Sequence, residues 1–370
     1  MLTVALDATP LLGQRTGIGV AVEGFLRHLA GRPELELSAY GLTLRGWAHL
    51  RGQVPGDVTE VVHRPAPAGL LLRCWERWDR PSGSWWTGRP QVVHGTNFVV
   101  PPTRRSARLV SVWDLTAVRF PQLCTPTSLR YPALVTRAVS TGAWVHTASA
   151  FVAEEVTEHF GVPPERVRVV APAVDLPFLP TPGRRPAGRP YILALGRAEP
   201  RKDLPVLVRA FDAVAADHPD LELKLAGPVG WGEDELAASI ASAHHRDRIE
   251  RTGWVPDRAA LVSGATVFAY PSLYEGFGLP PLEAMALGVP VVATRAGAVP
   301  EVVGPAALLT DPHDADGLAA ALSRLVEDRA CRDDLIAAGH ARVAGFGGRR
   351  TADGLVDAYR SLAAADRPRR

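Results

Sequence analysis

The chain has 370 residues, with 41 Lys or Arg and 39 Asp or Glu, which gives a formal net charge of +2. A single hydrophobic core stops growing well before this length, so two domains are expected. The balanced charge argues against a nucleic-acid partner, which requires a basic domain, and three scattered cysteines without metal-ligand spacing exclude a disulfide framework and a zinc site.

The first half of the chain alternates short apolar runs with helical patterns. This alternation predicts a parallel α/β sheet in a first domain that spans residues 1–178. Residues 177–190 then hold five prolines and two glycines without apolar periodicity, so we expect an exposed linker over 179–190. The strands are predicted over 3–6, 91–94, 109–112, 141–147 and 167–170, and a helix over 20–29.

A second alternation begins at Tyr191 and predicts another doubly wound sheet, in a domain that spans residues 191–350. The last helical stretch, 351–365, follows a glycine-rich break and is predicted to cross back onto the first domain. The strands of the second domain are predicted over 191–196, 221–227, 249–252, 267–272 and 290–294, with helices over 204–216, 233–243, 258–263 and 280–287.

Residues 196–203, GRAEPRKD, lie where the first strand of the second domain ends and a helix begins. Ligands bind at the carboxyl ends of such strands. Arg197 offers a bidentate guanidinium and Lys202 a compact ammonium, which together suit a diphosphate, and Asp203 is the predicted N-cap of the helix. The alternative is a solvated charged loop.

Residues 270–290, YPSLYEGFGLPPLEAMALGVP, form a second strand, loop and helix start. Proline suits the first turn of a helix because it lacks the N–H that would be left unpaired there. The backbone N–H groups of residues 276–279, then of Leu282 and Glu283, and the positive end of the helix dipole therefore predict an anion pocket.

Two carboxylates, Glu275 and Glu283, stand eight positions apart in this segment. A carboxylate accepts two hydrogen bonds at once and suits the vicinal hydroxyls of a sugar or ribose. The alternative is that Glu283 is an ordinary partner of the helix dipole and Glu275 a solvated loop residue.

With these residues in place, the chain resembles glycosyltransferase family 4, whose retaining members share the GT-B fold of two Rossmann-like domains facing a cleft. The pattern EGFGLPPLE matches the E-x7-E motif of that family, and the resemblance extends to GRAEPRKDL, RTGWVP and GAVPEVVGPAALLTDP. It covers most of the second domain.

The resemblance implies a role for each matching residue. Arg197 and Lys202 would bind the diphosphate, Glu283 the nucleotide ribose and Glu275 the donor sugar, with Glu275, Arg197 and Lys202 as the catalytic groups. The TGIGV stretch after the first strand is similar to the glycine-rich loop that lies under the diphosphate, although a plain tight turn is the alternative. The other donor-side residues are Gly17, Gly19, Gly196, Val255, Phe277, Gly278 and Leu279.

On the acceptor side, the resemblance implies that His94, Asn97 and Asp114 face the cleft. For His94 the alternative is a hydrogen-bonded histidine at a strand end. Many relatives have His-Asp where this chain has Trp113-Asp114. The indole either stacks on a sugar face or marks altered or weakened catalysis.

The resemblance implies that the acceptor hydroxyl attacks on the face from which the diphosphate departs, and that the departing phosphate takes the proton. The protein then contributes electrostatic stabilisation, so neither a metal nor another cofactor is expected. The wording EGFGLPPLEAM is most similar to bacterial mannosyltransferases that use GDP-mannose, ahead of enzymes that use UDP-hexoses. The acceptor is expected to be a glycan or a lipid-linked molecule of cell-envelope or polysaccharide biosynthesis.

Residues 69–86 contain four of the nine tryptophans. Helical spacing places Leu71, Trp75 and Trp78 on one face beside several arginines, and such a face would rest on an anionic membrane or grip a lipid carrier. The alternative is a helix that packs its tryptophans into the domain. The chain lacks an apolar run of about 18 residues and a leader-like N-terminus, so we expect a cytoplasmic protein, in some states at the inner face of the membrane.

Two other classes of protein fit the same patterns. A GT-B-fold sugar-nucleotide epimerase would share the diphosphate contacts and would need no acceptor. A non-catalytic sugar-nucleotide-binding partner of a polysaccharide assembly complex would keep Arg197, Lys202 and Glu283 and turn nothing over, and Trp113 is the feature that favours it.

Overall fold

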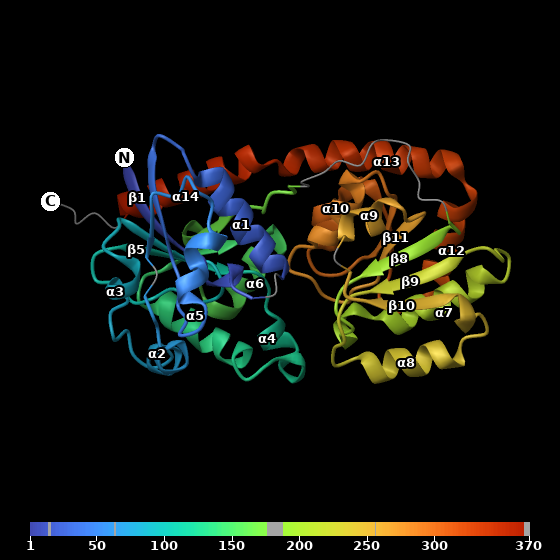
Figure 1. Cartoon of the computed structure of the whole chain (residues 1–370), viewed down its shortest axis with the longest axis horizontal. Helices are drawn as coiled ribbons and strands as arrows, with labels where there is room; N and C mark the ends of the chain where they lie inside the picture. Colours follow the sequence, from blue (N-terminus) through green and yellow to red (C-terminus); the bar gives the residue numbers. More distant parts are fainter. Residues whose placement is uncertain (14–15, 63, 176–187, 256, 366–370) are drawn as a thin grey trace. The chain divides into compact units, whose positions relative to one another are not determined.

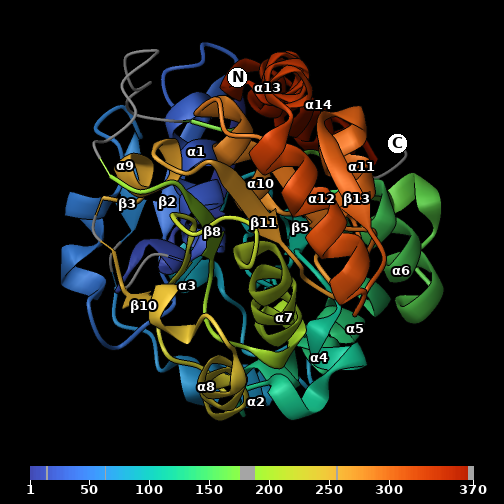
Figure 2. The ribbon, with the colours of Figure 1, turned by 90° about the vertical axis from the view of Figure 1, so that its right-hand side faces the viewer.

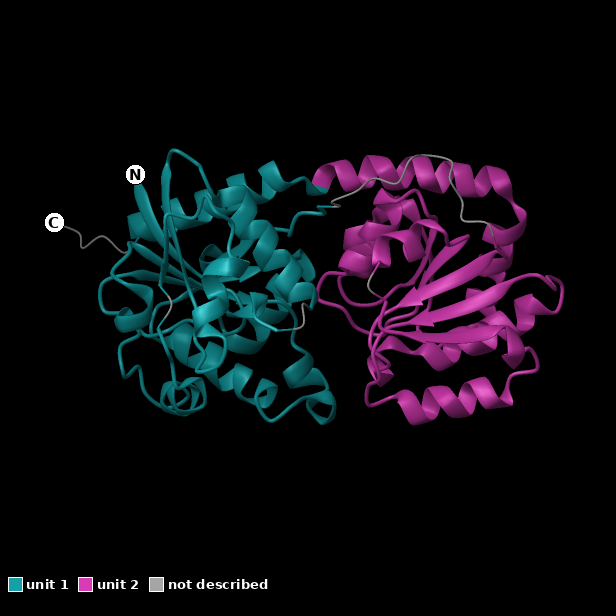
Figure 3. Cartoon of the chain, in the orientation of Figure 1, with its two compact units in different colours: residues 1–175, 346–370 teal, residues 176–345 magenta. Residues whose placement is uncertain are grey.

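The computed structural model describes residues 1–13, 16–62, 64–175, 188–255 and 257–365. The chain forms two compact units, one of residues 1–175 with 346–370 and one of residues 176–345 (Figure 3). Of the predicted linker over 179–190, all but the last three residues lie outside the described residues.

Unit 1 is built on a seven-stranded sheet in the order β3-β2-β1-β4-β5-β6-β7, with every neighbouring pair parallel. Strands β1 and β5 of this sheet are labelled in Figure 1. All six residues of β5 are buried, as expected of a strand that is covered on both faces. The strands are β1 Leu2–Asp7, β2 Leu35–Tyr40, β3 Glu60–Val62, β4 Val92–Gly95, β5 Ala107–Val112, β6 Trp144–Thr147 and β7 Val167–Val169.

Helices flank this sheet, and the last helix of the chain is one of them. Helix α14 contacts α1, β4 and β5. Its Tyr359 hydroxyl lies 2.8 Å from His94 Nδ1, and its Thr351 hydroxyl donates to the Ala171 carbonyl oxygen (2.9 Å). The α-helices of unit 1 are α1 Gly17–Leu29, α2 Ala68–Trp75, α3 Ser84–Thr87, α4 Thr116–Arg119, α5 Tyr131–Ser140, α6 Ala150–Phe160 and α14 Gly348–Ala365.

Unit 2 contains a six-stranded parallel sheet in the order β10-β9-β8-β11-β12-β13. Helices α7 and α12 pack against each other beside it, as the view onto this unit shows (Figure 2). The strands are β8 Tyr191–Leu195, β9 Glu222–Ala226, β10 Ile249–Gly253, β11 Val267–Tyr270, β12 Val291–Thr294 and β13 Ala307–Thr310. The α-helices are α7 Leu204–Ala215, α8 Glu233–Ser242, α9 Arg258–Ser263, α10 Leu279–Ala286, α11 Val299–Val303, α12 Ala315–Glu327 and α13 Arg329–Val343.

The predicted architecture of two doubly wound parallel sheets is confirmed. Strands β2, β3 and β13 were not among the predicted elements. In unit 2 the chain order reverses between β8 and β11, since β9 and β10 lie to one side of this pair and β12 and β13 to the other. The carboxyl ends of β8 and β11 therefore flank a topological switch point, where ligands of such sheets bind.

Candidate active site

Two loops of unit 2 meet at this switch point. One follows β8 and leads through a short 3-10 helix, Pro200–Lys202, into α7; the other follows β11 and leads into α10. Because β8 and β11 are parallel neighbours, both loops leave from the same edge of the sheet. The Leu273 N–H donates to the Arg201 carbonyl oxygen (2.8 Å), which ties the two loops together.

A cluster of charged side chains joins the loops. One carboxylate oxygen of Glu275, Oε1, lies 2.6 Å from Lys202 Nζ and 2.7 Å from Arg201 Nη1. Lys202 Nζ also donates to the Tyr270 hydroxyl (3.2 Å) and lies 4.6 Å from the centre of that ring. The side chains of Arg201, Lys202 and Glu275 are only 12 to 15% exposed, so their charges interact with little screening.

Burial and neighbouring charges act in opposite directions on the pKa of Glu275. Burial raises it, but the charges of Lys202 and Arg201 outweigh burial and lower the pKa to about 2. Burial lowers the pKa of Lys202, and the attraction of Glu275 opposes that shift. Burial raises the pKa of Tyr270 far above its ordinary value. At neutral pH the cluster thus presents an ionised carboxylate between two cations, which can accept hydrogen bonds from sugar hydroxyls.

The backbone around Glu275 is fixed by close contacts. The Ala298 N–H donates to the Glu275 carbonyl oxygen (2.9 Å), and a Cβ at Gly297 would lie 2.5 Å from that same oxygen. After Glu275 the chain turns at Gly278, whose φ is +102°. Any residue other than glycine would be strained in this conformation.

Helix α10 begins at Leu279, one residue before the predicted start, with Pro280 and Pro281 next in its first turn. Within the described chain, the N–H groups of Gly278 and Leu279 donate no hydrogen bond. Unpaired N–H groups at the positive end of a helix dipole favour an anion, and the anion pocket stays a prediction. Phe277, which also belongs to the predicted pocket, is buried.

Glu283 lies in α10 and pairs with a different cation. Its Oε2 is 2.5 Å from Nη2 of Arg258, the first residue of α9. Arg258 was missed by the sequence analysis, because nothing in the spacing shows which cation a helical glutamate meets. The neighbouring Val255 is half-buried in the segment after β10. Val255 and Glu283 thus lie on different segments, the first between β10 and α9 and the second in α10.

Arg197 differs from Lys202 because its side chain is 43% exposed. It donates from Nη1 to the Val229 carbonyl oxygen (3.0 Å). With Lys202 and Tyr270 it lines a hollow at the carboxyl ends of β8 and β11. The hollow measures about 10 Å³, which is room for about one water molecule, so Arg197 is a partly exposed residue at its border.

The loop after β9 packs on the loop after β8 without room for side chains. A Cβ at Gly227, where φ is +140°, would lie 2.0 Å from the Gly196 carbonyl oxygen. Arg251 holds the same loop, since its Nη1 donates to the carbonyl oxygens of Leu225 (3.0 Å) and Gly227 (2.7 Å). The arginine of the RTGWVP motif is thus a support for the Gly196 turn.

One prediction at this edge is wrong. Asp203 occupies the position before α7, but its carboxylate makes no capping hydrogen bond. It has φ +44°, in the left-handed region, and its Oδ2 lies 2.8 Å from His313 Nδ1. A residue in this conformation does not place its side chain over the helix N–H groups as an extended N-cap does.

In unit 1, the expectation that His94 faces a cleft is wrong. His94 is fully buried, with ring nitrogens 2.8 Å from the Tyr359 and Ser111 hydroxyls. Burial lowers its pKa well below the ordinary value. The alternative, a hydrogen-bonded histidine at a strand end, is confirmed.

Trp113 is also a core residue, at 8% exposed. Its indole N–H donates to the Thr96 carbonyl oxygen (2.7 Å) and its ring stacks on Phe25 at 5.9 Å between centroids. Asn97 and Asp114 are half-buried at the carboxyl ends of β4 and β5. The Asn97 Oδ1 is buried and has no hydrogen-bond partner in the described part of the chain, whereas the Asp114 Oδ1 accepts from the Thr116 N–H (2.8 Å).

The predicted glycine-rich loop is the first turn of α1 instead. Thr16 is the N-cap of that helix, and its hydroxyl accepts from the Gly19 N–H (3.5 Å). Gly17 is exposed and Gly19 is buried. A threonine before a helical run is a start signal, which the glycines had obscured.

The stretch over residues 69–86 divides into core and surface. Leu71 and Trp75 are buried, at 4% and 0% exposed, whereas Trp78 is 60% exposed. The prediction that Leu71, Trp75 and Trp78 form one exposed apolar face is therefore wrong for Leu71 and Trp75. These two side chains pack into the unit, which was the alternative.

The second half of the chain matches a known protein family. The model of the family "Glycosyl transferases group 1" matches residues 178–342, which include every predicted donor-side residue of unit 2. Over 288 residues the chain is 31% identical to O-antigen chain mannosyltransferase B of Escherichia coli, and the match covers 73% of this chain and 74% of that protein. The chain belongs to the group 1 glycosyltransferases.

Other relatives of this group 1 glycosyltransferase match over shorter stretches. The chain is 39% identical over 194 residues to an MMP alpha-(1->4)-mannosyltransferase of Mycolicibacterium hassiacum, with 49% of this chain and 44% of that protein covered. It is 34% identical over 223 residues to a D-inositol 3-phosphate glycosyltransferase of an Arthrobacter species, with 56% and 53% covered. The chain spans about half the length of these two relatives.

Solved structures show the fold of this glycosyltransferase. HepE of Anabaena in complex with UDP and glucose gives a TM-score of 0.74 at 18% identity, with 98% of this chain and 100% of that chain covered. A sucrose-phosphate synthase from Thermosynechococcus elongatus gives 0.75 at 21% identity, with 99% and 100% covered. The predicted GT-B fold is confirmed.

Proposed function

We propose that this glycosyltransferase moves mannose from GDP-mannose to a glycan or lipid-linked acceptor, with retention of configuration and without a metal ion. The observation that carries the proposal is the ionised Glu275 held by Lys202 and Arg201 at the switch point of unit 2. The names of two relatives, both mannosyltransferases, support the choice of donor sugar.

Arg197 and Lys202 bind the diphosphate of the donor, together with the N–H groups at the start of α10. Glu275 binds hydroxyls of the sugar, and Glu283 binds the ribose. The side chain of Glu283 is 17% exposed beside Arg258, so a ribose would share that carboxylate with the guanidinium. Asn97 and Asp114 of unit 1 bind the acceptor.

The transfer forms one bond and breaks one. The acceptor oxygen bonds to the anomeric carbon of the sugar while the bond from that carbon to the phosphate oxygen breaks, and the acceptor proton moves to the phosphate oxygen. Negative charge grows on the departing diphosphate. Lys202, Arg197 and the helix N-terminus stabilise that charge, and such preorganised electrostatic stabilisation is usually the largest catalytic contribution.

We further propose that the protein works in the cytoplasm and touches the inner face of the membrane through residues 69–86. No helix among the described residues is long and apolar enough to cross a bilayer. The exposed large apolar side chains of this stretch are Leu70, Trp78 and Trp85, at 60 to 64% exposed. Tryptophan suits the membrane interface because its ring is apolar and its N–H is polar.

The test is to incubate the protein separately with GDP-mannose, UDP-glucose and UDP-GlcNAc in EDTA, with candidate acceptor extracts. The release of nucleoside diphosphate and the products are followed. We expect GDP release from GDP-mannose, a loss of about a hundredfold or more in Glu275→Gln, and wild-type rates in the control Glu235→Gln on the exposed face of α8.

Each other outcome counts against a stated part of the proposal. Release from a UDP-sugar alone would overturn the donor, and loss of all activity in EDTA that returns with added metal would overturn metal independence. A free, altered sugar nucleotide without acceptor would establish the epimerase instead. Donor binding without turnover in any extract would establish the non-catalytic partner.

A further inference from the structure

A hollow of about 680 Å³ opens in unit 1, away from the predicted acceptor residues. It lies between the segment after α2 and the loop that precedes β5. Its lining includes Cys74, Trp78, Arg80, Ser82, Thr103 and Arg104. A hollow of this size holds a small molecule or the head of a larger one.

The hollow lies at the amino end of β5, whereas Asp114 follows the carboxyl end of the same strand. Strand β5 has six residues, so at about 3.3 Å per residue the two ends are roughly 20 Å apart. The hollow is therefore a separate site from the edge of the sheet where the acceptor is proposed to bind.

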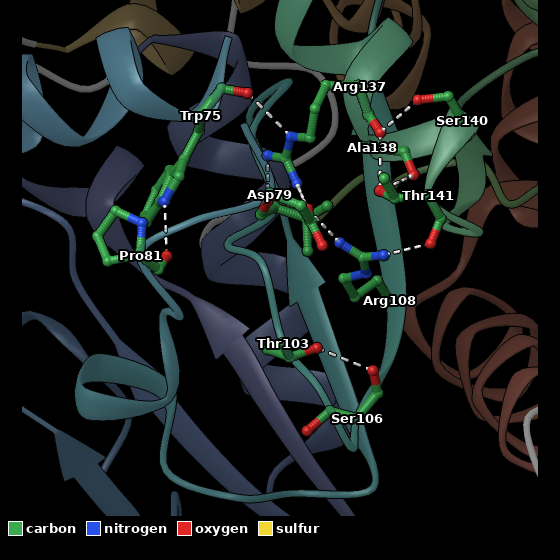
Figure 4. Close-up of polar contacts among 11 residues, drawn as sticks. Trp75, Asp79, Pro81, Thr103, Ser106, Arg108, Arg137, Ala138, Ser140 and Thr141 are labelled. Atoms are coloured by element: carbon green, nitrogen blue, oxygen red, sulfur yellow. Dashed lines mark hydrogen bonds and ion pairs between the residues drawn. The ribbon is translucent and has the colours of Figure 1, made fainter. Parts of the chain in front are cut away.

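One wall of the hollow is fixed by buried arginines. Asp79 Oδ1 accepts from Arg108 Nη1 and from Arg137 Nη1, both at 2.9 Å (Figure 4). The side chains of these arginines are 8% and 6% exposed, and Arg137 Nε also donates to the Trp75 carbonyl oxygen (3.0 Å). The segment after α2 is thus fastened to β5 and α5 in one arrangement.

A second set of contacts fixes the rim. The Trp75 indole N–H donates to the Pro81 carbonyl oxygen (2.9 Å; Figure 4). The Gly83 N–H donates to the Pro102 carbonyl oxygen (2.7 Å), and a Cβ at Gly83 would lie 2.3 Å from Pro101 Cβ. Both sides of the hollow are therefore held before any ligand arrives, which lowers the entropic cost of binding.

The charge of the hollow is positive. Asp79 is the acidic residue of the lining, and its carboxylate is already matched by two guanidinium groups. Arg80 and Arg104 also line the hollow and are exposed, and neither side chain makes an ion pair or hydrogen bond with any described residue. Two unmatched guanidinium groups favour a phosphate, which accepts hydrogen bonds from such planar donors in pairs.

Trp78 gives the hollow an apolar side next to this charge. Its ring is 60% exposed, and it belongs to the stretch for which membrane contact is proposed above. An anion bound here is therefore expected to carry an apolar body, as the head of a lipid does.

We propose that this hollow binds the phosphate headgroup of an anionic lipid, with Arg80 and Arg104 on the phosphate and Trp78 against the adjoining glycerol and acyl region. The proposal rests on the membrane contact proposed for residues 69–86 and turns that general contact into a defined site. It does not depend on the donor or on the reaction.

The test uses Cys74 in the lining as a reporter. The three cysteines are free, so Cys124→Ser with Cys331→Ser leaves one thiol to alkylate with a maleimide. We expect dihexanoyl phosphatidylglycerol, kept below its micelle concentration, to slow alkylation of Cys74 saturably. Adding Arg80→Ala and Arg104→Ala should weaken this protection about tenfold or more, since each substitution removes charge-assisted hydrogen bonds.

Matched controls separate the hollow from general effects. In a chain that keeps only Cys331, which lies in unit 2, the same lipid should leave alkylation unchanged. Arg349→Ala with Arg350→Ala, on the exposed start of α14, removes the same charge from unit 1 and should retain protection of Cys74. Circular dichroism checks that every variant is folded.

Three results would overturn the proposal. The first is no protection of Cys74 from alkylation, and the second is equal protection by dihexanoyl phosphatidylcholine. The third is protection by glycerol phosphate as strong as protection by the lipid, because that result would mean a site for free anions. Cosedimentation with vesicles that contain phosphatidylglycerol tests the membrane contact by itself. Because the short-chain lipid is monomeric, failure of one experiment is distinguishable from failure of the other.

Discussion

Replacing Glu275 by glutamine keeps the shape of the side chain and removes the charge that lies between Lys202 and Arg201. Both cations contact the same carboxylate oxygen, at 2.6 and 2.7 Å. Without the carboxylate, two cations that are 13 and 15% exposed lose their counter-charge and repel each other. Breaking a buried pair in this way typically costs about 3 to 5 kcal/mol.

The pKa of the Glu275 carboxyl group gives an independent value for this loss of stability. Its folded value of about 2 lies below the ordinary 4.5, and a difference of this size corresponds to about 3 kcal/mol of stability at pH 7. For a domain of the size of unit 2, such a loss lowers the melting temperature by roughly 6 to 20 °C. Scanning calorimetry and urea unfolding measure both quantities.

The pH dependence sharpens this prediction. Because folding depresses the pKa of Glu275, its contribution is complete above the unfolded pKa of 4.5 and is lost as the pH falls toward 2. The difference in unfolding free energy between the wild type and Glu275→Gln should therefore be constant above about pH 6 and shrink below about pH 5. Glu283→Gln is the matched control, with an expected cost of about 1 kcal/mol, since its partner Arg258 is 38% exposed. Equal stability of wild type and Glu275→Gln at pH 7 would refute the reasoning.

Three further predictions follow from the same geometry. Gly227→Ala should lower the melting temperature and weaken donor binding, because its Cβ would lie 2.0 Å from the Gly196 carbonyl oxygen. The control is Gly345→Ala, where a Cβ meets nothing within 4 Å. This control should leave the melting temperature unchanged in the same calorimetry. Arg197→Ala should raise the KM for the donor about tenfold or more with an unchanged melting temperature, since its side chain is 43% exposed; a melting temperature that falls with KM would contradict this. Burial lowers the pKa of the His146 ring to about 4. As the pH falls from about 6.5 to 4, the unfolded ring binds a proton and the folded ring does not. Unit 1 should therefore lose about 3 kcal/mol of stability over this range. Urea unfolding of His146→Gln should show a flatter profile over this range.

The sequence predicted the loops of unit 2 well because their signals are local. A buried strand that ends in glycine or proline and is followed by a helix start is visible within about ten residues. The order of the strands then follows from the alternation of elements. Lys202 and Glu275 are 73 positions apart, and placing both after strands of one doubly wound sheet was enough to put them on the same edge.

The predictions that failed depend on contacts between distant segments. His94 is followed by a polar stretch, but its ring nitrogens lie 2.8 Å from the hydroxyls of Ser111, 17 positions away, and Tyr359, 265 positions away in α14. Arg201 was overlooked because spacing does not show that two adjacent cations, Arg201 and Lys202, both contact the same carboxylate. Its Nη1 donates to the Tyr274 carbonyl oxygen (2.6 Å) as well as contacting Glu275, which is a feature of packing.

The charges at the switch point also bear on the proposal that the start of α10 binds the diphosphate. Arg197, Arg201 and Lys202 supply three positive charges, and Glu275 removes one. Glu199 removes another, since it lies 3.4 Å from Arg201 Nη2 and 3.7 Å from Arg197 Nε. The side chains alone thus leave one positive charge, whereas a diphosphate diester carries two negative charges. A helix N-terminus adds the equivalent of about half a charge, and its N–H groups at Gly278 and Leu279 have no other partner in the described chain. The side chains and the helix together therefore favour the diphosphate over a neutral sugar, and most strongly when the diphosphate gains charge as it departs.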